Sequence, residues 1–158
     1  MMNELNVVNI RLVNEPSLYS EKELKSPEAV LELMASEMAS YDREVLCVLN
    51  LKANGQVINM NIVSVGTVNA SLVNPREIFK SSILSNACGI ILVHNHPSGR
   101  MSPSKEDVNV TKRLRMAGAI LGIELLDHVI IGGTSGKMYS FMSSRKDLFA
   151  EKKFECVR

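Results

Sequence analysis

The sequence predicts a single layered domain of the α/β (α+β) class, in which helices flank one β-sheet. Segments with the apolar spacing of a helix alternate along the chain with short apolar runs rich in β-branched residues. The length of 158 residues suits one hydrophobic core, and a composition of 46% hydrophobic and 22% charged residues is typical of a globular chain. Since the sequence contains no internal repeat, low-complexity segment or linker, one domain is expected.

Three longer helices are predicted, and each opens with a capping residue. They run from Ser26 to about Ser40, from Asn74 to about Asn86, and from Ser104 to Gly118 or Gly122. Ser26-Pro27 combines an N-cap with a proline in the first turn, and an apolar stripe at helical spacing follows it: Val30, Leu33, Met34 and Met38. Asn74 is followed by Glu77 at the position of a capping-box acid, which explains that glutamate structurally.

The predicted strands alternate with these helices. They cover residues 44–51, 57–65, 89–94, 124–131 and 137–141, with an edge strand or arm at Val7 to Val13 and a short closing helix at Asp147 to Phe154. Asn54-Gly55 predicts a tight hairpin turn between the first two of the five. The short apolar run of residues 89–94 is typical of a central strand, and the glycines of residues 132–136 predict a turn.

Composition argues against a membrane protein and predicts a cytoplasmic one. No apolar run approaches the ~20 residues that a membrane helix needs, and residues 1–11 lack the pattern of a signal peptide. Cys47, Cys88 and Cys156 are odd in number and form no CxxC pair, which argues against a disulfide framework and a cysteine-rich zinc site. Cys47 and Cys88 are expected in the core. The net charge of +1 is too small to predict nucleic-acid binding.

Two of the three histidines, His94 and His96, stand at the end of an apolar run with one residue between them. Because alternate side chains of a strand share a face, both imidazoles can point at one ion. Ser104 and Asp107 follow at the start of the third predicted helix, where Asp107 lies one turn in. Two imidazoles and a carboxylate make a zinc site whose fourth position stays open to water.

Each piece of this pattern also has a structural explanation. Ser104-x-x-Asp107 is a capping box, in which the serine caps the helix and the acid occupies the third helical position. A His-x-His pair, such as His94 and His96, also occurs in strands by chance or at the surface. The joint arrangement of a strand-terminal pair, a loop and a helix-initial Ser-x-x-Asp is far rarer, and it favours a metal site.

The stretch from His94 to Asp107 matches the H-x-H-x7-S-x-x-D pattern of the JAB1/MPN/Mov34 (JAMM) metalloprotease superfamily. Its opening His-Asn-His-Pro-Ser-Gly, with residues 125–132 downstream, resembles the bacterial RadC family in particular, over roughly residues 26–145. The resemblance implies a JAB/MPN-like central mixed β-sheet flanked by helices, in a cytidine-deaminase-like arrangement. Residues 26–158 would form this domain, and residues 1–25 an N-terminal arm or edge strand.

The same resemblance implies a Zn²⁺ ion held by His94, His96 and Asp107. Ser104 would assist by polarising or hydrogen-bonding the substrate oxyanion, aided by the electropositive start of its helix. The superfamily also uses a glutamate at the start of a strand after the first long helix, and Glu44 occupies that place.

An acid at the start of an apolar run is costly to bury unless it has a partner or a task. For Glu44 the alternative is a solvent-facing strand end paired with Arg43. The catalytic interpretation predicts hydrolysis of a peptide or isopeptide bond by a zinc-activated water. Glu44 would act as the general acid/base, taking the proton of the water and delivering it to the leaving amine.

His128, within the fourth predicted strand, is expected to be a core histidine or one hydrogen-bonded to the metal-site loop rather than a ligand. The reason is that three protein ligands are already present. Asp127, beside it, would face the opposite side of a regular strand.

Two other functions stay open at this level. RadC relatives are described as DNA-repair proteins, and longer members carry a helix-hairpin-helix segment. About 25 residues before the first helix leave no room for that module, so a DNA-associated accessory role with a structural metal rests on analogy.

A metal-dependent phosphodiesterase is the other alternative, kept open by basic residues in and before the third helix: Arg100, Lys105, Lys112, Arg113 and Arg115. Their plainest explanation is a solvated helix face, because no stacking aromatic residues accompany them. A zinc deaminase is disfavoured because His-x-Glu and Pro-Cys-x-x-Cys are absent. The expected partner is an unidentified peptide or protein substrate, with no membrane and an undetermined oligomeric state.

Overall fold

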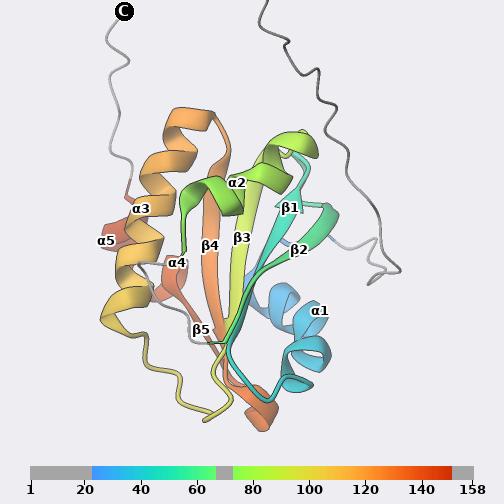
Figure 1. The fold of residues 1–158 in the computed structure, drawn as a ribbon, viewed down its shortest axis with the longest axis vertical. Helices are drawn as coiled ribbons and strands as arrows, with labels where there is room; N and C mark the ends of the chain where they lie inside the picture. Colours follow the sequence, from blue (N-terminus) through green and yellow to red (C-terminus); the bar gives the residue numbers. More distant parts are fainter. Residues whose placement is uncertain (1–22, 67–72, 151–158) are drawn as a thin grey trace, which may run out of the picture.

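The computed structural model describes residues 23–66 and 73–150, which build one mixed β-sheet with helices on both faces (Figure 1). The helices are α1 (Pro27–Ala39), α2 (Pro75–Leu84), α3 (Lys105–Leu121), α4 (Phe141–Ser144) and α5 (Lys146–Phe149). The strands are β1 (Val45–Leu51), β2 (Val57–Val65), β3 (Gly89–Asn95), β4 (Glu124–Ile131) and β5 (Met138–Ser140), and a 3₁₀ turn η1 covers Gly133–Ser135. This architecture confirms the predicted fold class and agrees with a JAB-like fold.

The sheet has the strand order β2-β1-β3-β4-β5, so β3 is its central strand as predicted. β1 and β2 form an antiparallel hairpin through Asn54-Gly55, where Gly55 has a φ of 87° that favours glycine. β1 also pairs antiparallel with β3, whereas β3 and β4 run parallel and are connected through α3. A parallel pair needs such a crossover, and its helix covers one face of the sheet.

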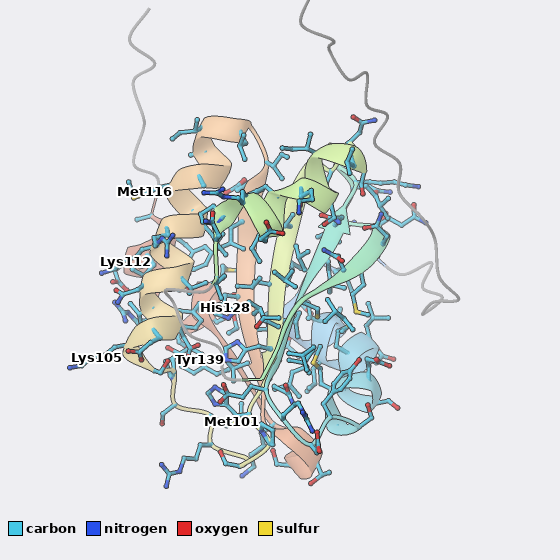
Figure 2. The ribbon with its side chains drawn as sticks, viewed as in Figure 1. Met101, Lys105, Lys112, Met116, His128 and Tyr139 are labelled. Carbon is cyan, nitrogen blue, oxygen red and sulfur yellow. The ribbon has the colours of Figure 1, made fainter. Side chains whose placement is uncertain are left out.

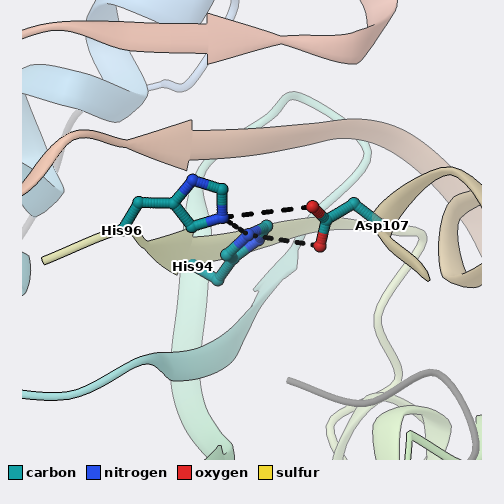
Figure 3. Close-up of side chains that lie close together, drawn as sticks. All are labelled: His94, His96 and Asp107. Carbon is teal, nitrogen blue, oxygen red and sulfur yellow. Dashed lines mark hydrogen bonds and ion pairs between the residues drawn. The ribbon is translucent and has the colours of Figure 1, made fainter. Parts of the chain in front are cut away.

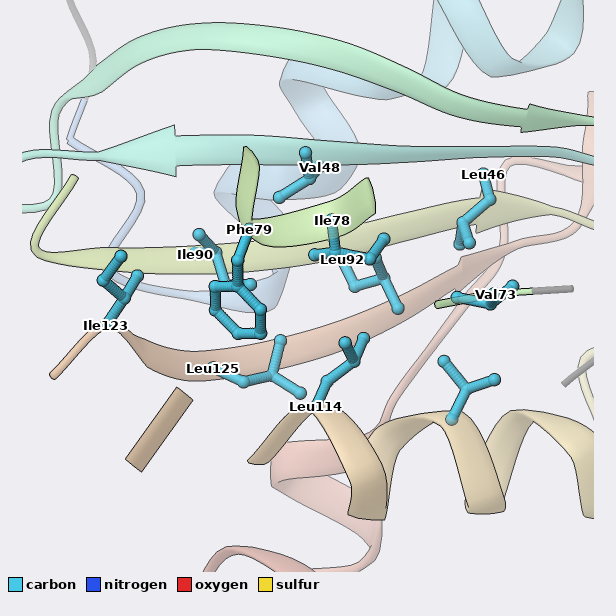
Figure 4. Close-up of a cluster of buried hydrophobic side chains, with 11 residues drawn as sticks. Leu46, Val48, Val73, Ile78, Phe79, Ile90, Leu92, Leu114, Ile123 and Leu125 are labelled. Carbon is cyan, nitrogen blue, oxygen red and sulfur yellow. The ribbon is translucent and has the colours of Figure 1, made fainter. Parts of the chain in front are cut away.

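Alternation along the strands divides the core between the two faces. One cluster, between the sheet and the helices α2 and α3, is drawn in Figure 4 and contains Leu46, Val48, Val73, Ile78, Phe79, Ile90, Leu92, Val110, Leu114, Ile123 and Leu125. The other, on the face covered by α1, contains Leu24, Val30, Met34, Met38, Cys47, Leu49, Leu51, Ile91, Val93, Val129 and Ile131. Even-numbered residues of β1 and β3 therefore face α2 and α3, and odd-numbered ones face α1.

Helix boundaries follow the predicted caps. The Ser26 side chain accepts a hydrogen bond from the Ala29 backbone N–H, and α3 ends at Gly122, whose φ of 70° is left-handed. The Asn74 side chain caps α2 by accepting from the Arg76 N–H. Glu77, predicted as a capping-box acid, instead places its carboxylate 2.7 Å from the ammonium nitrogen of Lys80.

Some details differ from the sequence prediction. Cys88 is exposed, so its assignment to the core was wrong, whereas Cys47 is buried. A four-residue helix, α4, was not predicted, and α5 begins at Lys146. The predicted strand at Val7 to Val13 and the end of the predicted closing helix lie outside the described residues. Among the helices that are described, none is long and apolar enough to cross a membrane.

Gly118, in the last turn of α3, allows the helix to approach the start of β4. A Cβ atom at this position would lie 2.3 Å from the backbone oxygen of Ile123 and 3.3 Å from the Phe79 ring. The backbone oxygen belongs to the chain itself and has little freedom to move away. A residue larger than glycine would therefore push α3 off the sheet.

We predict that Gly118→Ala lowers the free energy of unfolding, by about 1–3 kcal/mol, because the added methyl group overpacks this contact. Helix propensity alone would give the opposite sign, a gain of about 1 kcal/mol. Thermal or denaturant unfolding measures the difference, with Ala119→Gly at the exposed neighbouring position as the control for propensity. A Gly118→Ala variant as stable as the original would contradict the close contact.

Candidate metal centre

The candidate site lies where the carboxyl end of β3 meets the amino end of α3. His94 is even-numbered in β3, so its ring points to the same face as Ile90 and Leu92, toward α3. His96, two residues further along, follows the end of the strand. On α3, Asp107 belongs to the buried stripe that continues as Val110 and Leu114. Strand alternation and helical spacing thus bring the histidines and the aspartate together.

Figure 3 shows the three side chains converging on one point. The Nε2 atoms of His94 and His96 are 3.0 Å apart. Asp107 places Oδ1 3.4 Å from Nε2 of His94 and Oδ2 4.0 Å from Nε2 of His96. One ligand atom from each residue lies within 4.8 Å of the others, a spacing at which the cluster could bind a metal ion.

Ser104 and Asp107 also form the predicted capping box of α3. The Ser104 hydroxyl oxygen accepts from the Asp107 N–H at 3.1 Å, and the hydroxyl donates to Oδ2 of Asp107 at 2.7 Å. The backbone N–H of Ser104 donates to the same Oδ2 at 2.6 Å. Because Oδ2 is engaged by these two donors, Oδ1 is the carboxylate oxygen better placed to coordinate an ion.

The ring of His96 is oriented by the loop that follows it. Its Nδ1 lies 2.7 Å from the backbone oxygen of Arg100. A carbonyl oxygen only accepts, so Nδ1 carries a proton and Nε2 is the nitrogen left to bind an ion on the side of His94 and Asp107. Lone pairs and a carboxylate that converge in this way repel one another unless a cation lies between them. The donor set of two imidazoles and one carboxylate therefore fits a divalent metal.

Burial favours the neutral form of His94, which is the form that metal binding requires. His94 is fully buried, and this burial, with a smaller contribution from His96, lowers the pKa of His94 to about 4 against the opposing effect of Asp107. His128 is equally buried, and its pKa is also lowered, first by burial and then by His94 and His96.

His128, expected to be a core histidine or one hydrogen-bonded to the metal-site loop, is buried beside this cluster. Its Nε2 is 2.8 Å from Nδ1 of His94, so it contacts a proposed ligand directly rather than the loop. Asp127, its neighbour in β4, is directed to the other side. Its carboxylate accepts from the Ser140 hydroxyl at 2.6 Å and from the Met142 N–H at 2.9 Å.

Glu44 immediately precedes β1, the strand next to β3. Leu46 is paired with His94 in the antiparallel register, and Glu44 precedes Leu46 by two residues, the spacing at which side chains of a strand share a face. Arg43, its suggested partner on a solvent-facing strand end, binds Asp42, with Nε 2.8 Å from Oδ1.

Asn95 was missed by the sequence reasoning. Its buried side chain accepts from the Val45 N–H at 2.7 Å and donates to the Arg43 backbone oxygen at 3.0 Å. Asn95 therefore hydrogen-bonds to the backbone on both sides of Glu44. The sequence signal that could have pointed to Asn95 was its position between His94 and His96.

Thr111 was also missed. Its hydroxyl lies 2.7 Å from both the Asp107 backbone oxygen and Nδ1 of His128. The signal was its spacing, four residues after Asp107 and so on the same helix face. By contrast, Lys105 and Lys112 lie along the outer side of α3 as the solvated face that was expected (Figure 2).

Comparison with known proteins supports this description. A family model described as the RadC-like JAB domain matches residues 24–147. The chain is 50% identical over 109 residues to a UPF0758 protein of Shouchella clausii (69% of this chain, 47% of the relative). It is 52% identical over 113 residues to a UPF0758 protein of Syntrophomonas wolfei (69% and 48%). A UPF0758 protein of Methanosarcina mazei is 43% identical over 120 residues (76% and 51%).

The chain thus spans about half the length of the curated relatives it matches. The matched region contains all the residues of the candidate metal centre, together with α1 and the whole described sheet. The pattern of two histidines and Ser-x-x-Asp, the mixed sheet and the matching family model all lead to the same assignment: the chain belongs to the family of RadC-like JAB domains.

Proposed function

We propose that this protein is a zinc-dependent metallopeptidase of the JAMM type, which hydrolyses a peptide or isopeptide bond. The observation that carries the proposal is the convergence of the Nε2 atoms of His94 and His96 with the carboxylate of Asp107 in a buried position. A site with three protein ligands leaves one coordination position for water or substrate, which is the arrangement of catalytic rather than structural zinc.

Zinc is the metal best suited to this donor set. Imidazole nitrogen and carboxylate oxygen both coordinate Zn²⁺, while an all-oxygen set would favour Mg²⁺ or Ca²⁺. When bound by His94, His96 and Asp107, the ion would supply Lewis acidity and make a nearby water more acidic. The remaining chemistry belongs to the side chains around it.

Glu44 is proposed as the general acid/base. Its place two residues before Leu46, the β1 partner of His94, supports this role, because side chains at that spacing in a strand share a face. Glu44 would take a proton from the attacking water and deliver it to the departing amine. Asn95 supports this role because its side chain holds the backbone immediately before and after Glu44.

Ser104 is proposed to stabilise the oxyanion that develops on the substrate carbonyl. Its hydroxyl stands at the amino end of α3, a helix of 17 residues whose first-turn N–H groups create a positive potential. The hydroxyl proton now points to Asp107, so it would turn toward the substrate during the reaction.

The cellular setting and the substrate are part of the same proposal. Both described cysteines, Cys47 and Cys88, are free thiols, which suits the reducing cytoplasm that the sequence predicts. The substrate would be a peptide or protein.

The first test is metal content. We predict that the purified protein carries about one zinc per chain, and that the double substitution His94→Ala and His96→Ala abolishes binding because two of three ligands are lost. Elemental analysis after dialysis gives the stoichiometry. The control is Asp147→Asn, which changes an exposed aspartate paired with Arg145. Unchanged zinc in the double variant would refute the site.

The second test separates Glu44 from the metal. Glu44→Gln should retain zinc and lose about 10²–10⁴-fold in kcat, because an amide neither accepts nor delivers the proton. A substrate is first found by screening a peptide library, and rates are then compared side by side. Glu77→Gln, on the exposed face of α2, is the matched control and should leave the rate unchanged. An active Glu44→Gln variant would exclude the proposed acid/base.

The third test concerns Asn95. Asn95→Ala is expected to lower kcat about 10²-fold with zinc content preserved, since the backbone around Glu44 would no longer be held in place. Asn50→Ala is the control, because Asn50 is an equally buried asparagine of the sheet that binds Asn59 and Ser81 instead. Both variants should lose stability, but only the first should lose turnover. Equal kcat in the two variants would show that Asn95 does not position Glu44.

A further inference from the structure

A chain of buried hydrogen bonds connects two of the proposed ligands behind the candidate metal centre. The Thr111 hydroxyl lies 2.7 Å from the backbone oxygen of Asp107 and 2.7 Å from Nδ1 of His128. The other nitrogen of His128, Nε2, lies 2.8 Å from Nδ1 of His94. Thr111, His128 and His94 are all fully or almost fully buried, so water is not available to exchange for these contacts.

The donors and acceptors in this chain of hydrogen bonds fix the position of each proton. The Asp107 backbone oxygen only accepts, so the Thr111 hydroxyl donates to it. The Thr111 oxygen then accepts from His128, which puts the proton of that neutral ring on Nδ1. Nε2 of His128 is left with a lone pair and accepts from Nδ1 of His94. His94 therefore carries its proton on Nδ1, and its Nε2 is bare.

We propose that Thr111 and His128 are positioning residues that set the tautomer of His94, so that its Nε2 lone pair is directed at the metal. This inference rests on the metal centre of the proposed function. This chain of hydrogen bonds through Thr111 and His128, called the relay below, begins at the backbone of Asp107 and ends at the ring of His94. Both residues also present ligand atoms to the site. A bound ion would close the chain into a ring that joins α3, β3 and β4.

The packing around His128 fixes the plane of its ring. The ring of Phe141 stacks on it with 8° between the planes and 4.8 Å between centroids. Phe141 is the first residue of α4, and α4 is held by Asp127, whose carboxylate accepts from the Met142 N–H and the Ser140 hydroxyl. The interior position of His128 is visible in Figure 2. A rotated His128 would lose both its stacking and its hydrogen bonds.

The relay stabilises a tautomer of His94 that neutral imidazole does not prefer in water. Neutral imidazole in water prefers the proton on Nε2, the atom that faces the other ligands here. The hydrogen bond at the opposite nitrogen decides the tautomer in proteins. Groups that orient a ligating histidine in this way typically contribute about 10–100-fold in metal affinity. A histidine that merely filled the core would have no such effect.

Two substitutions at Thr111 isolate the hydroxyl. Thr111→Val keeps the shape and removes the hydroxyl, whereas Thr111→Ser keeps the hydroxyl and removes the methyl group. Zinc affinity is measured by competition with a chromophoric chelator, and far-UV circular dichroism with chelator present verifies the fold. Long-range proton–nitrogen correlation spectra of the metal-free full chain give the tautomer of His94 and of His128.

The expected result is a wild-type His94 protonated on Nδ1 and a wild-type His128 protonated on Nδ1. Thr111→Val should weaken zinc binding about 10–100-fold and move the His94 proton to Nε2, while Thr111→Ser should stay close to wild type. Equal affinity of wild type and Thr111→Val would overturn the relay and leave the proposed function intact, as would equal losses in both variants. A wild-type His94 protonated on Nε2 would overturn it as well, without needing any variant. Failure of the wild type to bind zinc would instead remove the proposed function, and the relay with it.

Discussion

The alternation of side chains along β3 is the constraint on which the site depends. Ile90 and Leu92 pack against α2 and α3, and the next position on the same face is His94. A shift of one residue in this strand would turn His94 toward α1 and bury an apolar side chain at the site. The register with β1 and β4 prevents such a shift, because residues on both faces of β3 are buried. The same packing that stabilises the sheet therefore directs the His94 ring toward α3 and the site.

Helix α3 also buries one stripe of residues, and this stripe contains both apolar and polar side chains. Its buried stripe is apolar at Val110 and Leu114 and polar at Asp107 and Thr111. Burying polar groups in this way costs free energy unless each has a partner. The hydrogen bonds to Ser104, His128 and the backbone provide those partners, and a cation would satisfy the converging ligand atoms that remain. Several of the buried polar side chains, among them His94, Asp107, Thr111 and His128, thus gather at the candidate metal centre.

Much of the fold was predictable because its signals are local. The caps at Ser26, Asn74 and Ser104 and the turn at Asn54-Gly55 set the element boundaries, and the structure confirms them. The proposed ligand set consists of residues close in sequence, at the end of one strand and the start of the next helix, and the structure brings them together.

The supporting groups were harder to predict because their partners are distant in sequence. Asn95 binds residues about 50 positions away, and His128 meets His94 only through the parallel pairing of β4 with β3. Cys88 was misplaced for a related reason, since its apolar character says nothing about the short connection in which it lies. Neither spacing nor composition records which distant strand becomes a neighbour.

Ser104 shows how one residue can satisfy both the structural and the catalytic interpretation. Its oxygen accepts from the Asp107 N–H while its proton is donated to Oδ2 of Asp107. Redirecting that proton to a substrate oxyanion would leave the accepted bond in place, so the helix would stay capped. Oδ2 would keep the backbone N–H of Ser104 as a donor. The ground-state cost is one neutral-to-charged hydrogen bond, about 1.5–3 kcal/mol, and a new bond to an oxyanion offsets it with the same kind of interaction. The capping box would therefore leave the Ser104 hydroxyl able to serve the proposed reaction.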